Sequence, residues 1–459
     1  MEIPWPLDGM EVVVVGAART GVAASRFLAS RGARVTLADR KAEEAFPGLR
    51  GELEPMGVRL LFGPHGEEEF RRADGIVLSP GVDPNSAVFQ GARRRGTPLV
   101  AEIELASWFL EAPILAITGT NGKTTCTTLL GMCLEAWGRR VFVGGNIGNP
   151  LINAVDAIPP WEMAVVEVSS FQLEAVERFR PKVAALLNLT EDHLDRHPSF
   201  EAYARAKGRL FQNQGKGDIA VVNLDDPEAL RIVPPSPPME LWGFTLADAE
   251  SAQAARTPEG IRFRVGGRSS RLVVENEHLA GPHGIQNLMA ASLCAMAVGC
   301  PLEAVGRGTR AFSGLEHRME MVGEINGVRF VNDSKATNVG AVVSALAACD
   351  GPVVLIAGGK DKGIDFAPLR EAVSAKARAV ILLGEAAPRM ALALEGTVPL
   401  HRAGGMDDAV PKALELASPG DTILLSPACS SFDQYGDYTE RGRHFKEAFR
   451  RMARALGGP

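Results

Sequence analysis

The stretch PILAITGTNGKTTCTTLLGMCLEA (residues 113–136) places a loop rich in Gly and Thr between an apolar run and a helix-forming run. The apolar run is typical of a buried strand, and the composition after the loop is typical of a helix. A loop in this position presents backbone N–H groups and the positive end of the helix dipole, which together bind phosphate oxygens. Residues 119–125 are therefore predicted to hold the phosphates of a nucleotide.

The side chains of this loop match the needs of a bound triphosphate. Lys123 would reach the β- and γ-phosphates, and the Thr124 hydroxyl would hold Mg²⁺. The usual pattern has a Gly six residues before the Lys, whereas this chain has Ile117, so the loop is a shortened variant. The alternative is a Gly-rich turn in which GKT occurs by chance, but the order of strand, loop and helix favours the phosphate site.

Short apolar runs alternate with Ala- and Leu-rich stretches along the whole chain, which predicts βα units and parallel sheets. The runs form three blocks, at 11–17, 34–39 and 75–81, at 113–119, 163–170, 183–189 and 219–224, and at 328–334, 352–359, 379–384 and 421–428. We therefore expect an α/β protein of three domains, over residues 1–111, 112–313 and 314–459, each built on a mostly parallel sheet. The first and third are predicted to be Rossmann-like and the central one to be of the P-loop type. Residues 241–275 are predicted to form an antiparallel excursion.

Composition limits the classes of protein to which the chain can belong. Its 49 basic and 55 acidic residues give a net charge of −6, which lacks the positive footprint of a nucleic-acid-binding protein. No apolar stretch is long enough to cross a bilayer. The net charge therefore argues against nucleic acid as a partner, and the short apolar stretches argue against a membrane. The six Cys show no paired spacing and the N-terminus shows no signal peptide, which together predict buried, reduced thiols in a cytoplasmic protein.

Polar residues near the other apolar runs of the central block are candidates for the same site. Glu167 ends a buried strand, where a carboxylate needs a partner, and is either a Mg²⁺ ligand opposite the loop or half of a structural ion pair. Asn146, in GGNIGNP, either positions a substrate carboxylate or belongs to an ordinary loop. His193 follows a strand end and is either a metal or substrate contact or a core residue. His197 is expected at the surface, and Lys207, taken alone, is expected to be a solvated charge.

The first block opens with a dinucleotide-type fingerprint, VVVVGAARTG. Gly16 and Gly21 match its glycines, Ala18 replaces the middle one, and Asp39 closes the next strand. A lone fingerprint of this kind is compatible with NAD, with another nucleotide diphosphate, or with a purely structural turn.

The third block carries polar segments after its apolar runs, at 317–320, 332–338, 358–363 and 426–438. Ligands of open α/β sheets bind beyond the carboxyl ends of the strands, so these segments and the loops of the central block predict a large cleft between domains. The cations and hydroxyls gathered there suit an anionic substrate. Taken one at a time, each segment is also compatible with an ordinary loop.

Six segments, in collinear order along essentially the whole chain, resemble the Mur ligase family of peptidoglycan synthesis. They are GTNGKTT, EVSSFQLE, NLTEDHLDRH, GLEHRME, NDSKATN and SPACSSFDQ. The resemblance implies a monomeric ATP-dependent ligase that uses two Mg²⁺ ions and a carbamylated Lys207. NDSKATN and SPACSSFDQ resemble the members that add D-glutamate to UDP-N-acetylmuramoyl-L-alanine, through an acyl phosphate. The first domain would then bind UDP rather than NAD.

The resemblance also implies roles for individual residues. Lys123, Glu167, His193 and Lys207 would be catalytic, and Thr124, Glu167, His193 and Lys207 would hold metal. ATP would be bound by Gly119, Thr120, Asn121, Gly122, Lys123, Thr124, Thr125, Asn287, Arg318, Asp333 and Lys335. The UDP substrate would be bound by Arg19, Thr20, Arg40, Lys41, Gly81 and Asn146, and D-glutamate by Thr337, Lys362, Ser431, Phe432 and Tyr438. The family's adenine motif has a first Asn where this chain has Gly284, so only Asn287 is assigned there, and Lys360 is given no role.

Three alternatives remain distinct from this ligase. A nicotinamide-dependent oxidoreductase would use the fingerprint of the first block but would leave the phosphate loop without a purpose. A nucleotide-dependent binding module would bind ATP without releasing phosphate. A sister ligase would join a different amino acid, and the segments of the third block distinguish it.

Overall fold

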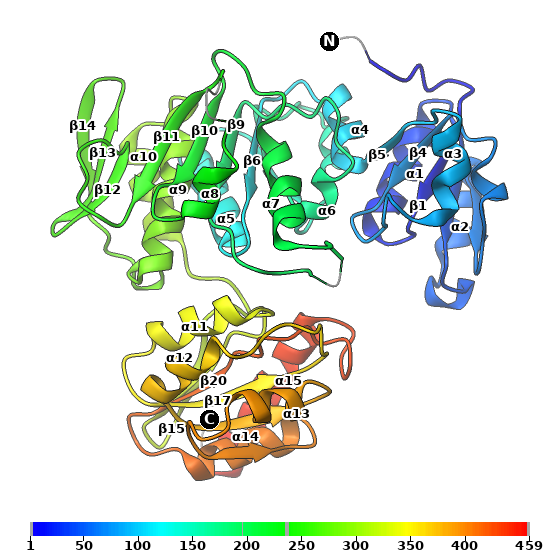
Figure 1. Cartoon of the computed structure of the whole chain (residues 1–459). Helices are drawn as coiled ribbons and strands as arrows, with labels where there is room; N and C mark the ends of the chain where they lie inside the picture. Colours follow the sequence, from blue (N-terminus) through cyan, green and yellow to red (C-terminus); the bar gives the residue numbers. More distant parts are fainter. Residues whose placement is uncertain (1–2, 195, 235–237, 457–459) are drawn as a thin grey trace. The chain divides into compact units, whose positions relative to one another are not determined.

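The computed structural model describes residues 3–194, 196–234 and 238–456, and it contains three sheets with helices packed against them (Figure 1). The chain divides into two compact units. The first comprises the residues up to Leu189 together with Glu201–Phe312, and the second comprises Thr190–Phe200 and the residues from Ser313 onward. Across the described residues, no helix is both long and apolar enough to cross a membrane.

The first sheet of unit 1 is entirely parallel, in the order β3-β2-β1-β4-β5. Its strands are β1 (Glu11–Val15), β2 (Arg34–Asp39), β3 (Arg59–Phe62), β4 (Gly75–Leu78) and β5 (Leu99–Ala101), and its helices are α1 (Arg19–Ser30), α2 (Leu49–Leu53), α3 (Gln90–Arg94) and α4 (Glu102–Phe109). The four valines of the central strand β1 are buried, which explains the unbroken apolar run there. The short edge strands β3 and β5 lack such a run, and sequence patterning missed both.

The second sheet of unit 1 has nine strands, in the order β14-β13-β12-β11-β10-β9-β6-β8-β7. They are β6 (Ile114–Thr118), β7 (Val141–Gly145), β8 (Met163–Glu167), β9 (Val183–Leu186), β10 (Ile219–Asn223), β11 (Glu240–Thr245), β12 (Ala254–Thr257), β13 (Gly260–Val265) and β14 (Arg268–Leu272). The helices are α5 (Lys123–Ala136), α6 (Ser170–Leu173), α7 (Phe200–Gly208), α8 (Pro227–Arg231), α9 (Pro282–Ala297) and α10 (Leu302–Ala311).

The predicted antiparallel excursion at 241–275 is only partly correct. β11 continues the parallel sheet, with Ile219 paired to Glu240, and β12 runs parallel to β11. β11 runs in the same direction as β10 because α8 and a long connection lie between the two strands. Parallel pairing of consecutive strands needs such a crossover. The antiparallel pairs of this segment are β12–β13 and β13–β14, and each pair is joined by a short turn.

The third sheet lies in unit 2, in the order β15-β16-β20-β17-β18-β19, and only β15 runs antiparallel to its neighbour. Its strands are β15 (Glu320–Ile325), β16 (Val328–Asn332), β17 (Val353–Gly358), β18 (Ala377–Leu383), β19 (Leu400–Arg402) and β20 (Thr422–Leu425), and its helices are α11 (Val339–Ala348), α12 (Leu369–Lys376), α13 (Ala387–Ala393), α14 (Met406–Leu416) and α15 (Tyr438–Ala455). Alternate residues of β17 enter two separate cores, Leu355 on one face and Ile356 on the other.

A buried carboxylate joins the two sheets of unit 1. Glu104, on α4, has no exposed surface and accepts hydrogen bonds from the backbone N–H groups of Glu177, Arg178 and Phe179, at 2.8–3.0 Å. Its side chain also accepts from Trp108 Nε1 at 2.9 Å. Four donors around one carboxylate compensate for its loss of hydration, so the first sheet is held firmly against the second.

Glu104→Ala is expected to lower the free energy of unfolding by about 3 kcal/mol, because it removes the shared acceptor of four donors, of which the Phe179 N–H and the Trp108 Nε1–H are buried. Thermal or urea denaturation measures the change. The matched control is Glu135→Ala, since Glu135 is exposed on α5 and should leave stability within about 0.5 kcal/mol of wild type. An equal effect of the two substitutions would contradict the role of Glu104.

Candidate active site

The phosphate loop turns directly into α5. The helix begins at Lys123, within the loop motif itself. Gly122 precedes it with φ +83°, a conformation that favours glycine, and a Cβ there would lie 2.2 Å from Asn287 Oδ1. Only glycine therefore allows Asn287, on α9, to pack against the loop.

Asn188 holds the phosphate loop in shape, a role that sequence reasoning did not assign. Its Oδ1 accepts from the Asn121 N–H at 2.8 Å, and its Nδ2 donates to the Asn121 carbonyl at 3.1 Å. Its own carbonyl accepts from the Thr120 N–H at 2.9 Å. The available signal was its position, directly after an apolar strand and at the start of the NLTEDH segment.

The loop fits the phosphates of a nucleotide. Lys123 Nζ folds over it and donates to the carbonyls of Gly119 at 2.9 Å and Thr120 at 2.8 Å. Thr125 Oγ1 is buried in the first turn of α5 without a hydrogen-bond partner, and an oxygen of a bound phosphate would satisfy it. With the first N–H groups of α5, these donors suit a polyanion.

Glu167 lies at the end of β8 and connects two candidate loops. It is 2% exposed, its Oε2 accepts from Thr124 Oγ1 at 2.8 Å, and its Oε1 accepts from Asn146 Nδ2 at 2.8 Å. The hydroxyl and carboxylate oxygens of this pair are ligands that Mg²⁺ prefers, although no cluster of three or more His, Cys, Asp or Glu marks a metal site among the described residues. The Thr124–Glu167 pair is thus suited to hold Mg²⁺ beside the phosphate loop.

Lys207 reaches the same loop from α7. It is 1% exposed, so the expectation of a solvated charge, which the residue alone gave, is wrong. Its Nζ donates to the Gly119 carbonyl at 2.8 Å, lies 3.3 Å from Thr118 Oγ1, and stands 4.8 Å from the Tyr203 ring. A buried amine at the base of the phosphate loop is a candidate for chemistry rather than for solubility.

The segment Thr190–Phe200 packs with unit 2 and contains both histidines of NLTEDHLDRH. His193 Nε2 lies 3.8 Å from Asp192 Oδ2. His197 is buried, at 3% exposure, so its expected place at the surface is wrong. The N–H groups of Arg196 and His197 both donate to the His193 carbonyl, and this tight turn places His197 inside.

The first sheet carries the predicted UDP contacts at the carboxyl ends of β1, β2 and β4. Asp39 accepts from the N–H groups of Ala17 and Lys41, at 2.8 and 2.9 Å, and so ties the fingerprint loop to the end of β2. Arg19 Nη1 donates to the carbonyl of Gly148 at 2.5 Å, in the loop that also carries Asn146. The remaining predicted contacts are half-buried Thr20 and exposed Arg40, Lys41 and Gly81.

Unit 2 gathers the predicted third-domain residues at the carboxyl ends of β16, β17 and β20. Asp333 is buried and accepts from Ser426 Oγ at 2.9 Å and from the Met319 N–H at 3.2 Å. Burial raises the pKa of Asp333 to about 7, against the opposing charge of Arg318. Lys335 Nζ stands 5.3 Å from the Tyr438 ring.

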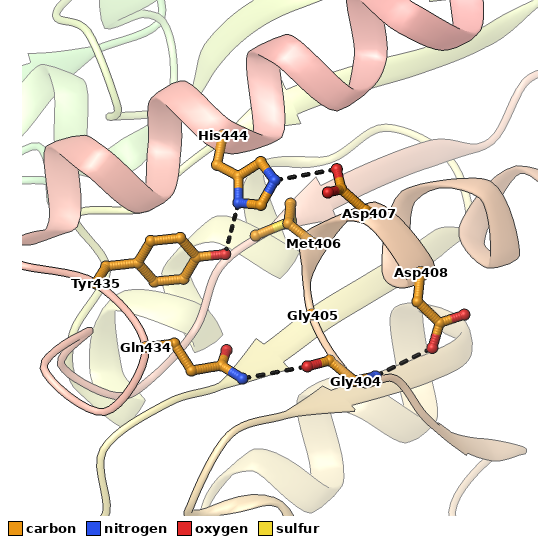
Figure 2. Close-up of a pocket in the computed structure, with 8 residues that line it drawn as sticks. All are labelled: Gly404, Gly405, Met406, Asp407, Asp408, Gln434, Tyr435 and His444. Carbon is orange, nitrogen blue, oxygen red and sulfur yellow. Dashed lines mark hydrogen bonds and ion pairs between the residues drawn. The ribbon is translucent and has the colours of Figure 1, made fainter.

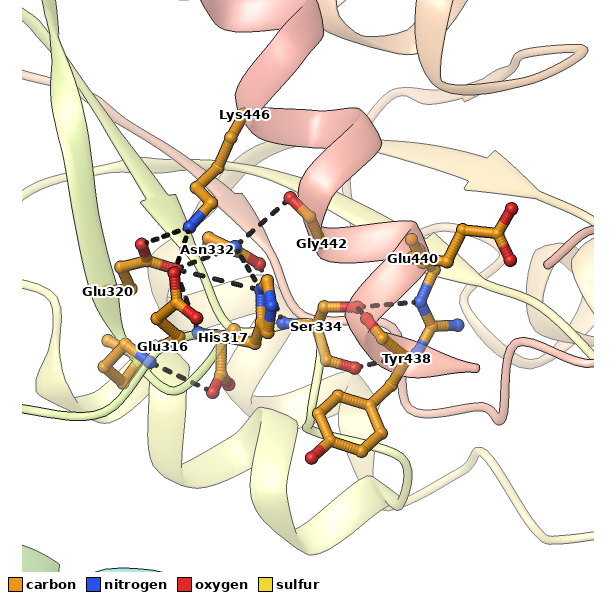
Figure 3. A network of polar contacts seen from close by, with 12 residues as sticks. Glu316, His317, Glu320, Asn332, Ser334, Tyr438, Glu440, Gly442 and Lys446 are labelled. Atoms are coloured by element: carbon orange, nitrogen blue, oxygen red, sulfur yellow. Dashed lines mark hydrogen bonds and ion pairs between the residues drawn. The ribbon is translucent and has the colours of Figure 1, made fainter. Parts of the chain in front are cut away.

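A polar network joins α15 to the segments on either side of Asp333 (Figure 3). Lys446, on α15, donates to Glu316 at 2.9 Å and to Glu320 at 2.8 Å. Asn332 Nδ2 lies 2.9 Å from Nδ1 of the buried His317, whose carbonyl accepts from the Lys335 N–H at 3.0 Å. The network thus fixes the backbone on both sides of Asp333.

Of the five predicted acceptor residues, Lys362 and Thr337 are in contact, whereas Phe432 lies at the surface. Lys362 Nζ lies 3.4 Å from the Thr337 carbonyl and 4.0 Å from Asp192 Oδ1, and Ser431 is buried. Phe432, in contrast, is 70% exposed. Asp192, which accepts from Asn338 Nδ2 at 3.2 Å, is a further residue of this group that sequence reasoning missed.

A separate pocket in unit 2 is lined by Gly404, Gly405, Met406, Asp407, Asp408, Gln434, Tyr435 and His444 (Figure 2), none of which is a predicted site residue. Its polar groups bond to one another. His444 links Tyr435 OH and Asp407 Oδ1, each at 3.0 Å, and Gln434 donates to the Gly404 carbonyl. These contacts connect the loop after β20 to α14 and α15.

The pH dependence of stability tests the burial of Asp333. Because its folded-state pKa is raised to about 7, the folded protein binds the proton more tightly than the unfolded chain does. This stabilisation is full below the ordinary carboxyl pKa and is lost as the pH rises through about 7. The free energy of unfolding of wild type minus that of Asp333→Asn should therefore fall by about 1 kcal/mol per pH unit between about pH 5 and pH 7.

Urea denaturation across this range measures the difference between the two proteins. The control is Asp350→Asn, because the Asp350 side chain is 94% exposed and its replacement should leave the free energy of unfolding within about 0.5 kcal/mol of wild type. A pH-independent difference for Asp333→Asn would show that the carboxylate is solvated.

A phosphate-binding loop with an acidic partner strand, on one of three parallel-dominated sheets, defines a nucleotide-binding α/β enzyme. The chain belongs to the Mur ligase family, whose members are ATP-dependent ligases that form amide bonds. Family models match residues 10–101 (Mur ligase MurD-like, N-terminal domain), 117–295 (Mur ligase middle domain) and 317–429 (Mur ligase, glutamate ligase domain).

Two relatives match almost the entire chain. It is 47% identical over 447 residues to UDP-N-acetylmuramoylalanine--D-glutamate ligase of Geobacter metallireducens, covering 96% of this chain and 97% of the relative. It is 46% identical over 443 residues to the enzyme of the same name from Trichlorobacter lovleyi, covering 96% and 99%.

Solved structures of other peptide ligases share the fold. A pseudomurein peptide ligase type C from Methanothermus fervidus superposes with a TM-score of 0.62 at 19% identity, covering 97% of this chain and all of that one. MurF ligase from Thermotoga maritima, in complex with ADP, gives 0.62 at 16% identity, covering 91% and 96%. The predicted three-domain α/β architecture is therefore confirmed, while the exact boundaries at 111/112 and 313/314 stay predictions.

Proposed function

We propose that the protein is an ATP-dependent ligase that adds D-glutamate to UDP-N-acetylmuramoyl-L-alanine in peptidoglycan precursor synthesis. The observation that carries the proposal is the convergence of Thr124, Asn146 and Lys207 with Glu167 around one phosphate loop. The names of the relatives, at 46–47% identity over nearly the whole chain, support the choice of substrates. The protein acts in the cytoplasm as a monomer in this proposal.

In the reaction, a carboxylate oxygen of the L-alanyl group attacks the γ-phosphorus of ATP, and ADP leaves. The resulting acyl phosphate is attacked by the amine of D-glutamate, which loses a proton, and inorganic phosphate leaves as the amide forms. Negative charge develops on phosphoryl and then on tetrahedral oxygens, so fixed cations and N–H donors supply most of the catalysis.

The phosphate loop would position and stabilise ATP. Gly119, Thr120, Asn121 and Gly122 present the backbone, and Thr125 donates its buried hydroxyl. Lys123 Nζ lies within 3 Å of the Gly119 and Thr120 carbonyls and would move onto the γ-phosphate. Thr124 and Glu167 would hold Mg²⁺, which when bound would neutralise charge on the β- and γ-phosphates. Asn287 would contact adenine.

Lys207 and His193 would complete the metal environment. Reaction of the neutral Lys207 amine with CO₂ would give a carbamate, a carboxylate-like group that only lysine can supply. The carbamate and His193 would hold a second Mg²⁺. The support is that Lys207 is buried at the loop and that its Nζ lies 2.8 Å from the Gly119 carbonyl.

The remaining assignments follow the same proposal. Arg19, Thr20, Arg40, Lys41, Gly81 and Asn146 would bind the UDP substrate. Arg318, Asp333 and Lys335 would contact ATP from the third domain. Thr337, Lys362, Ser431, Phe432 and Tyr438 would bind D-glutamate, with Lys362 pairing with one carboxylate. The exposure of Phe432 gives its assignment the least support of this group.

Release of inorganic phosphate is the decisive measurement. With ATP, Mg²⁺ and UDP-N-acetylmuramoyl-L-alanine present, release should require D-glutamate and should stay at background with L-glutamate, L-lysine or D-alanine. Release with another amino acid would keep the phosphoryl chemistry and overturn the acceptor. Absence of release with all of them would favour the nucleotide-dependent binding module.

A further inference from the structure

Arg441 is a buried cation that has no role in the proposed reaction. It lies in the first turn of α15, is 2% exposed, and donates to three neutral acceptors. Nε donates to Ser334 Oγ at 3.0 Å, Nη2 donates to the Ser334 carbonyl at 2.8 Å, and Nη1 donates to the Cys429 carbonyl at 3.1 Å. Within the described part of the chain, no carboxylate lies at ion-pair distance from its guanidinium.

The position of this charge is unfavourable for stability. Removing a guanidinium from water is costly unless an opposite charge compensates it, and here burial lowers the pKa of Arg441 to about 10, against the weaker opposing effects of Cys429 and Asp433. The first turn of a helix is also the positive end of its dipole, which disfavours a cation. Lys446, the other buried basic residue of α15, is instead paired with Glu316 and Glu320.

Three loops meet on the Arg441 guanidinium, and each carries residues of the proposed acceptor pocket. Ser334 belongs to the loop with Lys335 and Thr337, and Cys429 belongs to the loop with Ser431. The third is the GGKDKG loop, in which a Cβ on Gly359 would lie 3.0 Å from Arg441 Nη1. This close approach of backbone brings the loop of Lys362 against the same cation. Figure 3 shows Ser334 beside the first turn of α15.

We propose that Arg441 is a positioning and specificity-determining residue for the acceptor. Its guanidinium fixes the three loops, and its buried charge, which no carboxylate of the described residues pairs at ion-pair distance, makes the pocket electropositive, so that an amino acid with two carboxylates is preferred over one with a single carboxylate. The negative charge of the bound dianion then offsets the desolvation free energy of the buried guanidinium. This inference rests on the proposed D-glutamate ligase function.

The test compares variants that keep or remove the charge while retaining a hydrogen-bond donor. Arg441→Lys keeps the cation, Arg441→Gln keeps an amide donor for Ser334 without charge, and Arg441→Met removes both. Arg450→Met is the control, since Arg450 is exposed on the same helix. Phosphate release gives KM for D-glutamate, ATP and the UDP substrate and the ratio of kcat/KM for D-glutamate to that for D-glutamine, and Tm reports folding.

Arg441→Gln is expected to raise KM for D-glutamate by about tenfold and to lower the D-glutamate to D-glutamine ratio by a similar factor, with KM for ATP and the UDP substrate unchanged. Arg441→Lys should restore most of both values. If Arg441→Met fails to fold, the comparison of Arg441→Gln with Arg441→Lys still tests whether the charge determines the preference for D-glutamate. An unchanged ratio in Arg441→Gln, or an equal rise of all three KM values, would overturn the inference. Absence of D-glutamate-dependent release by the wild type would instead overturn the proposed function.

Discussion

Lys123→Ala is expected to reduce D-glutamate-dependent phosphate release by about 10³-fold or more. The Lys123 amine lies within 3 Å of the Gly119 and Thr120 carbonyls, at the centre of the phosphate loop. A bound γ-phosphate would offer it a stronger, charged acceptor, and its charge would act on the oxygens where negative charge grows during transfer. Since this interaction strengthens in the transition state, kcat should fall more than KM for ATP rises.

Steady-state kinetics of phosphate release measure both parameters. Lys216→Ala is the matched control, because Lys216 is an exposed lysine of the same unit and should leave both within about twofold of wild type. Tm verifies that the Lys123 variant is folded. A variant that still binds ATP and retains more than about a tenth of wild-type kcat would contradict the placement of Lys123 on the γ-phosphate.

The central strands of all three sheets could be predicted from sequence because they are buried on both faces. β17 is the clearest example, since Leu355 and Ile356 point into different cores and the strand is apolar without interruption. The edge strands β3, β5, β7, β15 and β19 could not be predicted in this way. Partial exposure and short length remove the continuous apolar signal, as in the three residues of β19.

The candidate site was predictable where chemistry depends on residue type and position after a strand. Glu167 meets both conditions, and the structure places it against Thr124. Asn188 and Arg441 were not predictable, because their roles come from hydrogen bonds to backbone groups of loops distant in sequence. His197 shows the same limit, since its burial depends on a tight turn and not on local hydropathy.

Lys207→Ala is expected to lower phosphate release on the order of 10³-fold, and short carboxylic acids should restore part of it. Lys207 is 1% exposed and has therefore lost most of its hydration, and its Nζ lies 2.8 Å from the Gly119 carbonyl of the phosphate loop. Conversion of the amine to a carbamate would place an anion near the Mg²⁺ that Thr124 and Glu167 are proposed to hold, and acetate or formate could occupy the space that the Ala variant opens.

The rescue separates a chemical role of Lys207 from a structural one. Arg205→Ala is the control, because Arg205 is exposed on the same helix, and it should neither lose activity nor respond to acetate. A structural lysine would predict a lower Tm for Lys207→Ala and no gain with acetate or formate, whereas a carbamate predicts a gain that saturates with carboxylate concentration. Chloride at equal ionic strength should give no gain, since it offers charge without the pair of oxygens that a metal site requires. Failure of every carboxylate tested, in a variant that remains folded, would exclude the carbamate and leave Lys207 with a structural role, as a donor to the Gly119 carbonyl.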